Sequence, residues 1–144
     1  HATFFDYDKD GDLDLLMVNY DSTVSLYRND VVSSENYIRV FCQGTTSCLD
    51  GLGAKVKITT PDGVIQYFEI RSGSNLGGGD EMCAHFGIGS NTMVNEIEVT
   101  WLSGGTNVKT NMAANQEVII LEAAVVPVDP ALFLSDEHCF YRLG

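Results

Sequence analysis

Five aspartates occupy alternate positions in one short stretch near the start of the chain: Asp6, Asp8, Asp10, Asp12 and Asp14. Carboxylates held this close together repel one another strongly unless a cation lies between them. Ca²⁺ prefers about six to eight oxygen ligands in flexible geometry, and a single acidic loop can supply most of them. We therefore predict a calcium site whose ligands are the side chains of Asp6, Asp8, Asp10 and Asp14 and the backbone carbonyl of Asp12. The alternative is an acidic turn that stays solvated and holds no ion.

The calcium-binding loop of an EF-hand has a similar composition, but the residues that flank the acidic loop argue against an EF-hand. Gly11, at the sixth position counted from Asp6, allows the sharp turn that such a loop requires. An EF-hand also needs a bidentate glutamate at the twelfth position and a helix on either side. Met17 stands at that position, and residues 2–5 and 15–18 have the composition of strands. We therefore expect a strand–loop–strand calcium site.

The residue types that carry most enzyme chemistry form no recognisable constellation. The three histidines, His1, His85 and His138, have no serine or cysteine at the spacing of a nucleophile motif. His85 lies in a strand-like pattern, which favours a packed histidine. The glycine run 77–79 is followed by Asp80 rather than by a lysine and a helix, so it does not indicate a phosphate-binding loop. We expect a protein without catalytic activity.

Four cysteines, Cys42, Cys48, Cys83 and Cys139, have neither a C-x-x-C spacing nor a histidine at zinc-finger distance. An even count favours two disulfides in an extracellular protein, and three pairings are open. We favour Cys42–Cys48, which would close a short polar loop and stabilise it by about 2 kcal/mol. Cys83–Cys139 would then anchor the end of the chain. The alternative is a set of buried free thiols.

The excess of acidic over basic residues limits which partners the protein can bind. Eight basic and 20 acidic residues give a net charge of −12, which repels nucleic acid and attracts divalent cations. No apolar run is long enough to span a membrane. The chain begins with His1 rather than methionine, and we expect a processed product or a fragment of a longer protein.

Alternation of apolar and polar residues with a period of two dominates the chain and predicts strands. The clearest run is 53–59, and Thr-Pro-Asp-Gly at 60–63 predicts a turn into a returning strand at 64–70. A second clear run is 95–101, followed by a turn at 103–105. The residues expected to face inward are Ala54, Val56, Ile58, Ile97, Val99 and Trp101. Further strands are expected at 15–19, 23–28, 37–42, 83–86 and 117–121. Many short strands with glycine-rich turns indicate an all-β sandwich or barrel-like domain.

The acidic loop and its flanks resemble an FG-GAP/VCBS repeat of integrin-like β-propellers. The matching residues are Phe-Phe-Asp-Tyr-Asp-Lys-Asp-Gly-Asp-Leu-Asp-Leu-Leu at 4–16 and Leu-Tyr-Arg-Asn at 26–29. The resemblance implies a structural calcium site within one propeller blade. A single blade cannot bury both of its faces, so neighbouring blades or another chain should cover it.

The middle of the chain resembles the ASPIC/UnbV domain of cartilage acidic protein and of many bacterial surface proteins. Six pieces match in the family's order, and Cys42, Cys48 and Cys83 are additions to the usual pattern. The pieces are Asn-Tyr-Ile-Arg-Val at 36–40, Asp-Gly-Leu-Gly-Ala-Lys-Val at 50–56, Arg-Ser-Gly-Ser at 71–74, His-Phe-Gly-Ile-Gly at 85–89, Val-Thr-Trp-Leu-Ser-Gly-Gly at 99–105 and Asn-Gln at 115–116. The resemblance implies a secreted or cell-surface protein with a role in adhesion or matrix and without established enzymatic activity.

Three regions follow from these patterns. Residues 1–32 are expected to form a partial propeller-like blade, and residues 33–122 a β-sandwich-like ASPIC/UnbV domain on which it packs or to which it is linked. Residues 123–144 are expected to form an extended tail, because each proline in Val-Val-Pro-Val-Asp-Pro at 125–130 disfavours helix before it. That tail is a candidate for contact with another chain or for anchoring by a disulfide.

These expectations combine into a non-catalytic extracellular calcium-binding protein with a structural or adhesive role, assembling with other protein chains. One alternative is a subunit of an extracellular filament built by β-strand exchange, since unpaired strand edges invite such pairing. Another is a carbohydrate-binding module in which Trp101, Tyr67 or Tyr37 stacks on a glycan. The phase of Trp101 with Ile97 and Val99 favours an inward side chain instead.

Overall fold

The computed structural model describes residues 1–31, 35–73 and 78–124, and these residues form ten strands and no helix. The strands belong to three sheets, none of which closes into a barrel. The predicted all-β, sandwich-like class is therefore confirmed. The expected tail at 123–144, with His138 and Cys139, lies outside the described residues from position 125 onward.

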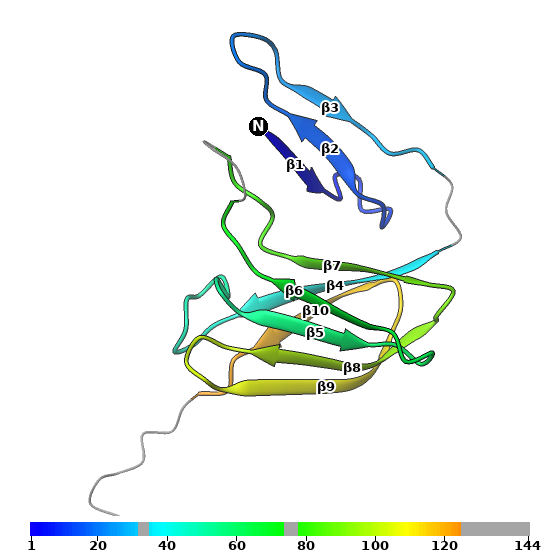
Figure 1. The fold of residues 1–144 in the computed structure, drawn as a ribbon, viewed down its shortest axis with the longest axis vertical. Helices are drawn as coiled ribbons and strands as arrows, with labels where there is room; N and C mark the ends of the chain where they lie inside the picture. The colour runs from blue at the N-terminus through cyan, green and yellow to red at the C-terminus, as the bar shows by residue number, and fades with distance from the viewer. Residues whose placement is uncertain (32–34, 74–77, 125–144) are drawn as a thin grey trace, which may run out of the picture.

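The N-terminal sheet contains three antiparallel strands in the order β1-β2-β3. Its strands are β1 (Ala2–Phe5), β2 (Asp14–Met17) and β3 (Ser25–Tyr27). The acidic loop joins β1 to β2, and Phe5 pairs with Asp14 across its base. The flanks of the loop are thus strands, as the sequence predicted. Figure 1 shows this sheet at one end of the molecule, beside β7.

The other two sheets face each other as a sandwich (Figure 1). One has the order β10-β4-β7, and its strands are β4 (Asn36–Gln43), β7 (Ala84–Gly89) and β10 (Gln116–Leu121). In this sheet β10 runs parallel to β4, whereas β7 is antiparallel to it. The other sheet has the order β6-β5-β8-β9, with β5 (Lys55–Thr59), β6 (Ile65–Glu69), β8 (Met93–Thr100) and β9 (Thr106–Ala113), all antiparallel.

The hydrophobic core lies between the two sheets of the sandwich. All six side chains expected to face inward are buried, with exposed fractions of 3% or less. They pack against Ile38 and Val40 of β4, Phe86 and Ile88 of β7, and Val118 and Ile120 of β10. The indole N–H of Trp101 donates to Oδ1 of Asn107 at 2.6 Å, which satisfies its polar atom. A buried Trp101 does not offer a stacking face to a glycan.

The turn at 60–63 has the predicted chemistry. Gly63 adopts φ +84°, which favours glycine, and its N–H donates to the carbonyl of Thr60 at 2.9 Å. The hydroxyl of Thr60 donates to the carboxylate of Asp62. The result is a hairpin from β5 to β6.

The cysteines differ from the expected pairing. Among the described residues, Cys42, Cys48 and Cys83 form no disulfide with one another, so the Cys42–Cys48 disulfide is absent. The reason is the phase of β4, which turns Cys42 into the core with Val40, whereas Cys48 lies exposed in the following loop. The pairing of Cys83 with Cys139 involves a residue outside the described part of the chain.

The loop after β4 is held instead by the carboxylate of Glu122, which is 2% exposed. Oε2 accepts the backbone N–H groups of Thr45, Thr46 and Ser47 at 2.7, 2.8 and 2.7 Å. Oε1 accepts the hydroxyls of Ser47 at 2.8 Å and Ser103 at 2.6 Å. Burial alone would raise the pKa of Glu122, but the Ser103 hydroxyl and these N–H donors outweigh it and lower the pKa to about 2.

Candidate metal centre

The backbone of the acidic loop folds back on itself between β1 and β2. Lys9 and Gly11 have φ values of +63° and +97°, which reverse the direction of the chain. The N–H of Gly11 donates to Oδ2 of Asp6 at 3.2 Å, and the N–H of Tyr7 donates to Oδ2 of Asp14 at 2.8 Å. These bonds bring the first and last aspartates of the loop to the same place.

Three of the five predicted ligands come together. Carboxylate oxygens of Asp6, Asp8 and Asp14 all lie within 4.8 Å of one another. Asp6 and Asp14 are buried, and Asp8 is exposed. The pKa of Asp8 is raised, by desolvation first and then by the charges of Asp10 and Asp14. Asp10 and Asp12 lie outside this cluster, where Oδ1 of Asp10 accepts the N–H of Asp12 at 2.9 Å.

Asp6 leaves one carboxylate oxygen unsatisfied. Its Oδ1 is buried and has no hydrogen-bond partner among the described residues. Buried polar atoms are nearly always paired, and an unpaired one costs about 1–3 kcal/mol, more for a charged group. The cluster offers only oxygen donors, the set that hard cations such as Ca²⁺ prefer. The residues present therefore fit a hard divalent cation.

Asp14 ties the loop to the third strand of its sheet. Its Oδ1 accepts the backbone N–H of Asn29 at 2.8 Å, just beyond the end of β3. The neighbouring Arg28 lies 3.9 Å from Asp8 and 2.5 Å from Asp30. The loop geometry thus depends on the whole N-terminal sheet.

The inner side of the loop contacts the sandwich through a buried arginine that our sequence analysis did not single out. The guanidinium of Arg39 lies 3.7 Å from Oδ2 of Asp6 and 2.6 Å from Oε1 of Glu117, and it also pairs with Glu81. Its side chain is 4% exposed. In β4, Arg39 lies between the core residues Ile38 and Val40, so its side chain leaves the opposite face of the sheet. The sequence did contain one sign of this contact, because Arg39 is a cation placed between two apolar residues of a predicted strand, Ile38 and Val40.

Gly11 lies directly against Tyr37 of β4. A Cβ added at Gly11 would come within 2.1 Å of Cε1 of Tyr37. Beneath it, the ring of Tyr37 stacks on His85 of β7, with centroids 5.6 Å apart and planes 8° from parallel. Burial lowers the pKa of His85, and the charge of Arg39 lowers it further. The acidic loop therefore rests on an aromatic stack with no room for a side chain at Gly11.

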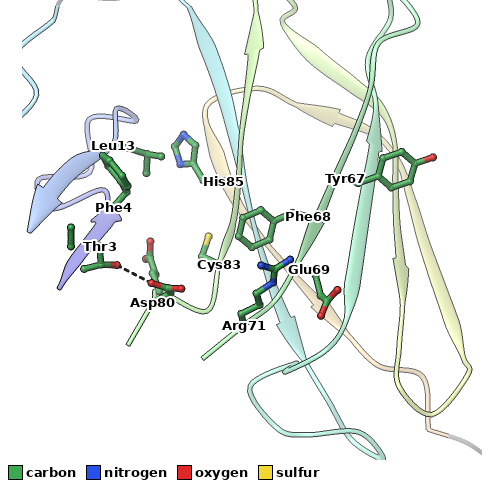
Figure 2. A pocket seen from close by; sticks show the side chains of 12 residues that line it. Thr3, Phe4, Leu13, Tyr67, Phe68, Glu69, Arg71, Asp80, Cys83 and His85 are labelled. Atoms are coloured by element: carbon green, nitrogen blue, oxygen red, sulfur yellow. Dashed lines mark hydrogen bonds between the residues drawn. The ribbon is translucent and has the colours of Figure 1, made fainter. Parts of the chain in front are cut away.

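A cavity of about 540 Å³ lies between the N-terminal sheet and the sandwich. Figure 2 shows Phe4 and Leu13 on one side and Phe68 on the other, with Cys83 and His85 between them. Burial raises the pKa of the Cys83 thiol to about 12, so Cys83 is uncharged at neutral pH. The sequence alone does not predict this cavity, because its walls come from segments far apart in the chain.

The fold defines an all-β sandwich with a three-stranded sheet docked on it through an acidic loop. The chain belongs to the ASPIC and UnbV family, whose family model matches residues 44–127, more than half of the 144 residues. Strand β4 precedes the matched residues, yet it pairs with both β7 and β10, so the sandwich extends beyond the match. No curated protein matches the chain. None of the described residues forms a helix long and apolar enough to cross a membrane.

Proposed function

We propose that this chain is a non-catalytic extracellular protein with a structural or adhesive role, in which Ca²⁺ fixes the N-terminal sheet on the sandwich. The observation that carries the proposal is Oδ1 of Asp6, which is buried and unpaired among the described residues and lies beside the carboxylates of Asp8 and Asp14. A bound cation would satisfy this oxygen and offset the repulsion among the three carboxylates.

The side chains of Asp6, Asp8 and Asp14 would hold the ion. Asp10 and the carbonyl of Asp12, the other predicted ligands, would join them once the ion draws the exposed half of the loop inward. The role of the ion is structural, because the other face of the loop is packed on Tyr37. The proposed site is therefore a structural calcium site and not a calcium sensor that opens on binding.

The extracellular location rests on two supports. Calcium-binding modules of extracellular proteins work at roughly 10⁻⁴–10⁻³ M, which suits a loop that is partly exposed. The resemblance of residues 4–16 to an FG-GAP/VCBS repeat, followed by an ASPIC/UnbV domain, is the arrangement of secreted and surface proteins.

The exposed apolar side chains of the N-terminal sheet also favour contact with a protein partner. Monomeric proteins rarely leave large contiguous apolar patches exposed. This small sheet and its loops leave nine large apolar side chains exposed. Phe4 and Leu13 line the cavity, and the other seven are Tyr7, Val18, Tyr20, Val24, Leu26, Tyr27 and Val31. We propose that further protein surface covers them, from neighbouring chains or from sheets of the same kind. A monodisperse monomer in calcium, measured by light scattering, would exclude the filament alternative.

Thermal unfolding with 5 mM CaCl₂ or with EDTA tests the calcium site, with circular dichroism as the readout. A ligand that binds only the folded state raises stability, and at a Kd of roughly 10⁻⁴–10⁻³ M, 5 mM calcium adds about 1–2 kcal/mol. We expect a rise in Tm of several degrees in the wild type and no rise in Asp6→Asn. Asp50→Asn removes a carboxylate from an exposed loop and should keep the rise. A wild-type Tm that EDTA leaves unchanged would overturn the proposal.

A further inference from the structure

The cavity between the N-terminal sheet and the sandwich has the size and position of a ligand site. Its volume of about 540 Å³ lies within the range of roughly 300–1,000 Å³ for small-molecule pockets, which are frequent where two packed units meet. It is separate from the acidic carboxylate cluster, although Leu13 of the acidic loop forms part of its wall. The ligand class of this cavity therefore follows from its own lining residues and not from the carboxylate cluster.

The walls of the cavity are apolar and open to solvent. Phe4 is 61% exposed, Leu13 is 37% exposed and Phe68 is 39% exposed. The ring of Phe68 is held edge-on against Phe86 of the core, with centroids 6.4 Å apart, so its position is fixed by packing. An apolar group placed between these side chains gains from burial, at about 25 cal/mol per Å². Aromatic faces also attract cations.

The charged residues around the cavity are mostly acidic. Three carboxylates, those of Glu69, Asp80 and Glu81, line the cavity together with one guanidinium, that of Arg71. Glu81 is already paired with Arg39. Within the described part of the chain, neither Glu69 nor Asp80 forms an ion pair. These two carboxylates without an ion pair outnumber Arg71, and the net charge of the chain is −12, so a cation is favoured over an anion.

We propose that this cavity binds an amphipathic cation, meaning an apolar or aromatic group that carries an ammonium or guanidinium. Its apolar part lies between Phe4, Leu13 and Phe68. Its charge faces Asp80, on the side of the N-terminal sheet, or Glu69, on the side of β6 (Figure 2). A free amine and a basic side chain beside an apolar residue of a peptide share this chemistry. The proposal does not depend on calcium binding, and its test uses one fixed calcium concentration.

The test is a titration of the ¹⁵N-labelled chain, followed through its amide chemical shifts. Three ligands with the same ring separate charge from shape: phenethylamine, 2-phenylethanol and 3-phenylpropionate. We expect phenethylamine to shift the amides of Thr3, Arg71 and His85 saturably and to bind at least about fivefold more tightly than 3-phenylpropionate. Acetyl-Phe-Lys-amide and acetyl-Phe-Glu-amide form the peptide arm. Tighter binding of the lysine peptide than of phenethylamine identifies a peptide as the source, and the reverse order identifies a free amine.

The double variant Glu69→Gln with Asp80→Asn tests the role of charge. Asparagine keeps an Oδ1 acceptor for the hydroxyl of Thr3, which donates to Asp80 at 3.4 Å. We expect this variant to bind phenethylamine about fivefold more weakly and 2-phenylethanol unchanged, which also shows that the cavity is intact. Asp50→Asn, away from the cavity, should leave both affinities unchanged. Equal binding of the cationic and anionic ligands, shifts at other residues, or unchanged affinity in the double variant would each overturn the proposal.

Discussion

The guanidinium of Arg39 lies 3.7 Å from Oδ2 of Asp6, and both side chains are almost completely buried. Asp6 belongs to the acidic loop and Arg39 to the sandwich, so this pair joins the two parts of the structure. The two oxygens of Asp6 differ, because Oδ2 faces Arg39 and the N–H of Gly11, whereas Oδ1 has no partner among the described residues. One carboxylate thus connects the proposed metal site to the packing of the N-terminal sheet.

Replacing Arg39 by methionine should destabilise the protein and change its response to calcium. The change leaves the buried Asp6 and the partly exposed Glu81 and Glu117 without their cation. Removing one partner of a buried pair, as Arg39 and Asp6 form, costs about 3–5 kcal/mol. It also removes a positive charge beside the metal site, so calcium should stabilise this variant more than the wild type. Urea unfolding with calcium and with EDTA measures both effects.

Arg39→Lys is the matched control for charge. It keeps one positive charge, but it cannot contact Glu81 and Glu117 through two separate nitrogens as Arg39 does. We expect an intermediate stability and a calcium response close to that of the wild type. Equal calcium responses in the lysine and methionine variants would contradict an electrostatic link between Arg39 and the loop.

Replacing Gly11 by alanine should lower the free energy of unfolding by about 2–4 kcal/mol, because a strained backbone and a steric clash add together. The Cβ would meet the ring of Tyr37 at 2.1 Å, at a residue whose φ is +97°. Gly63→Ala separates the two effects, since Gly63 has φ +84° and nothing within 4 Å of an added Cβ. That control should cost about 1 kcal/mol. Similar costs at both positions, from urea unfolding, would show that the loop does not rest on Tyr37.

The carboxylate of Glu122 should make the free energy of unfolding fall at acidic pH. Its pKa is about 2 in the folded protein against an ordinary value of 4.5, so its contribution is complete above about pH 4.5 and is lost as pH falls towards 2. Glu122→Gln should therefore lower stability at neutral pH and flatten its fall between these values. Urea unfolding at a series of pH values checks this. A slope equal to that of the wild type would mean that the carboxylate is not held by its five donors.

The thiols should differ sharply in reactivity. Cys48 is exposed, whereas Cys42 and Cys83 are buried, and burial raises their pKa values to about 11 and about 12. In a Cys139→Ser background, we expect one thiol per chain to react at once with Ellman's reagent and two more to react only after unfolding. A single reactive thiol in denaturant, without reductant, would indicate the Cys42–Cys48 disulfide instead.

Local patterns predicted much of the fold. The hairpin of β5 and β6 and the inward side of β8 were readable because alternation and turn chemistry act within a few residues. Strand β9 was missed, because most of its residues are exposed and the strand lies at a sheet edge, so burial imposes no alternation on it.

Contacts over long distances in the chain were not predictable in this way. The loop at 45–47 suggested a disulfide, but its partner is Glu122, about 75 residues further on. Likewise, Arg39 contacts both Asp6 of the acidic loop and Glu117 of β10, which are far apart in the chain. The composition of the acidic loop indicated its chemistry, whereas the surface on which it packs could be found only from the fold.

The parallel pairing of β10 with β4 has a consequence for how the protein is made. Gln116 lies beside Ile38, and the chain forms five other strands between β4 and β10 before the pair can form. A ribosome releases β4 long before β10, so the nascent chain exposes an incomplete sheet edge until nearly the whole sandwich has been synthesised. Closing so large a loop is slow, so the sandwich should complete its fold only after β10 has left the ribosome.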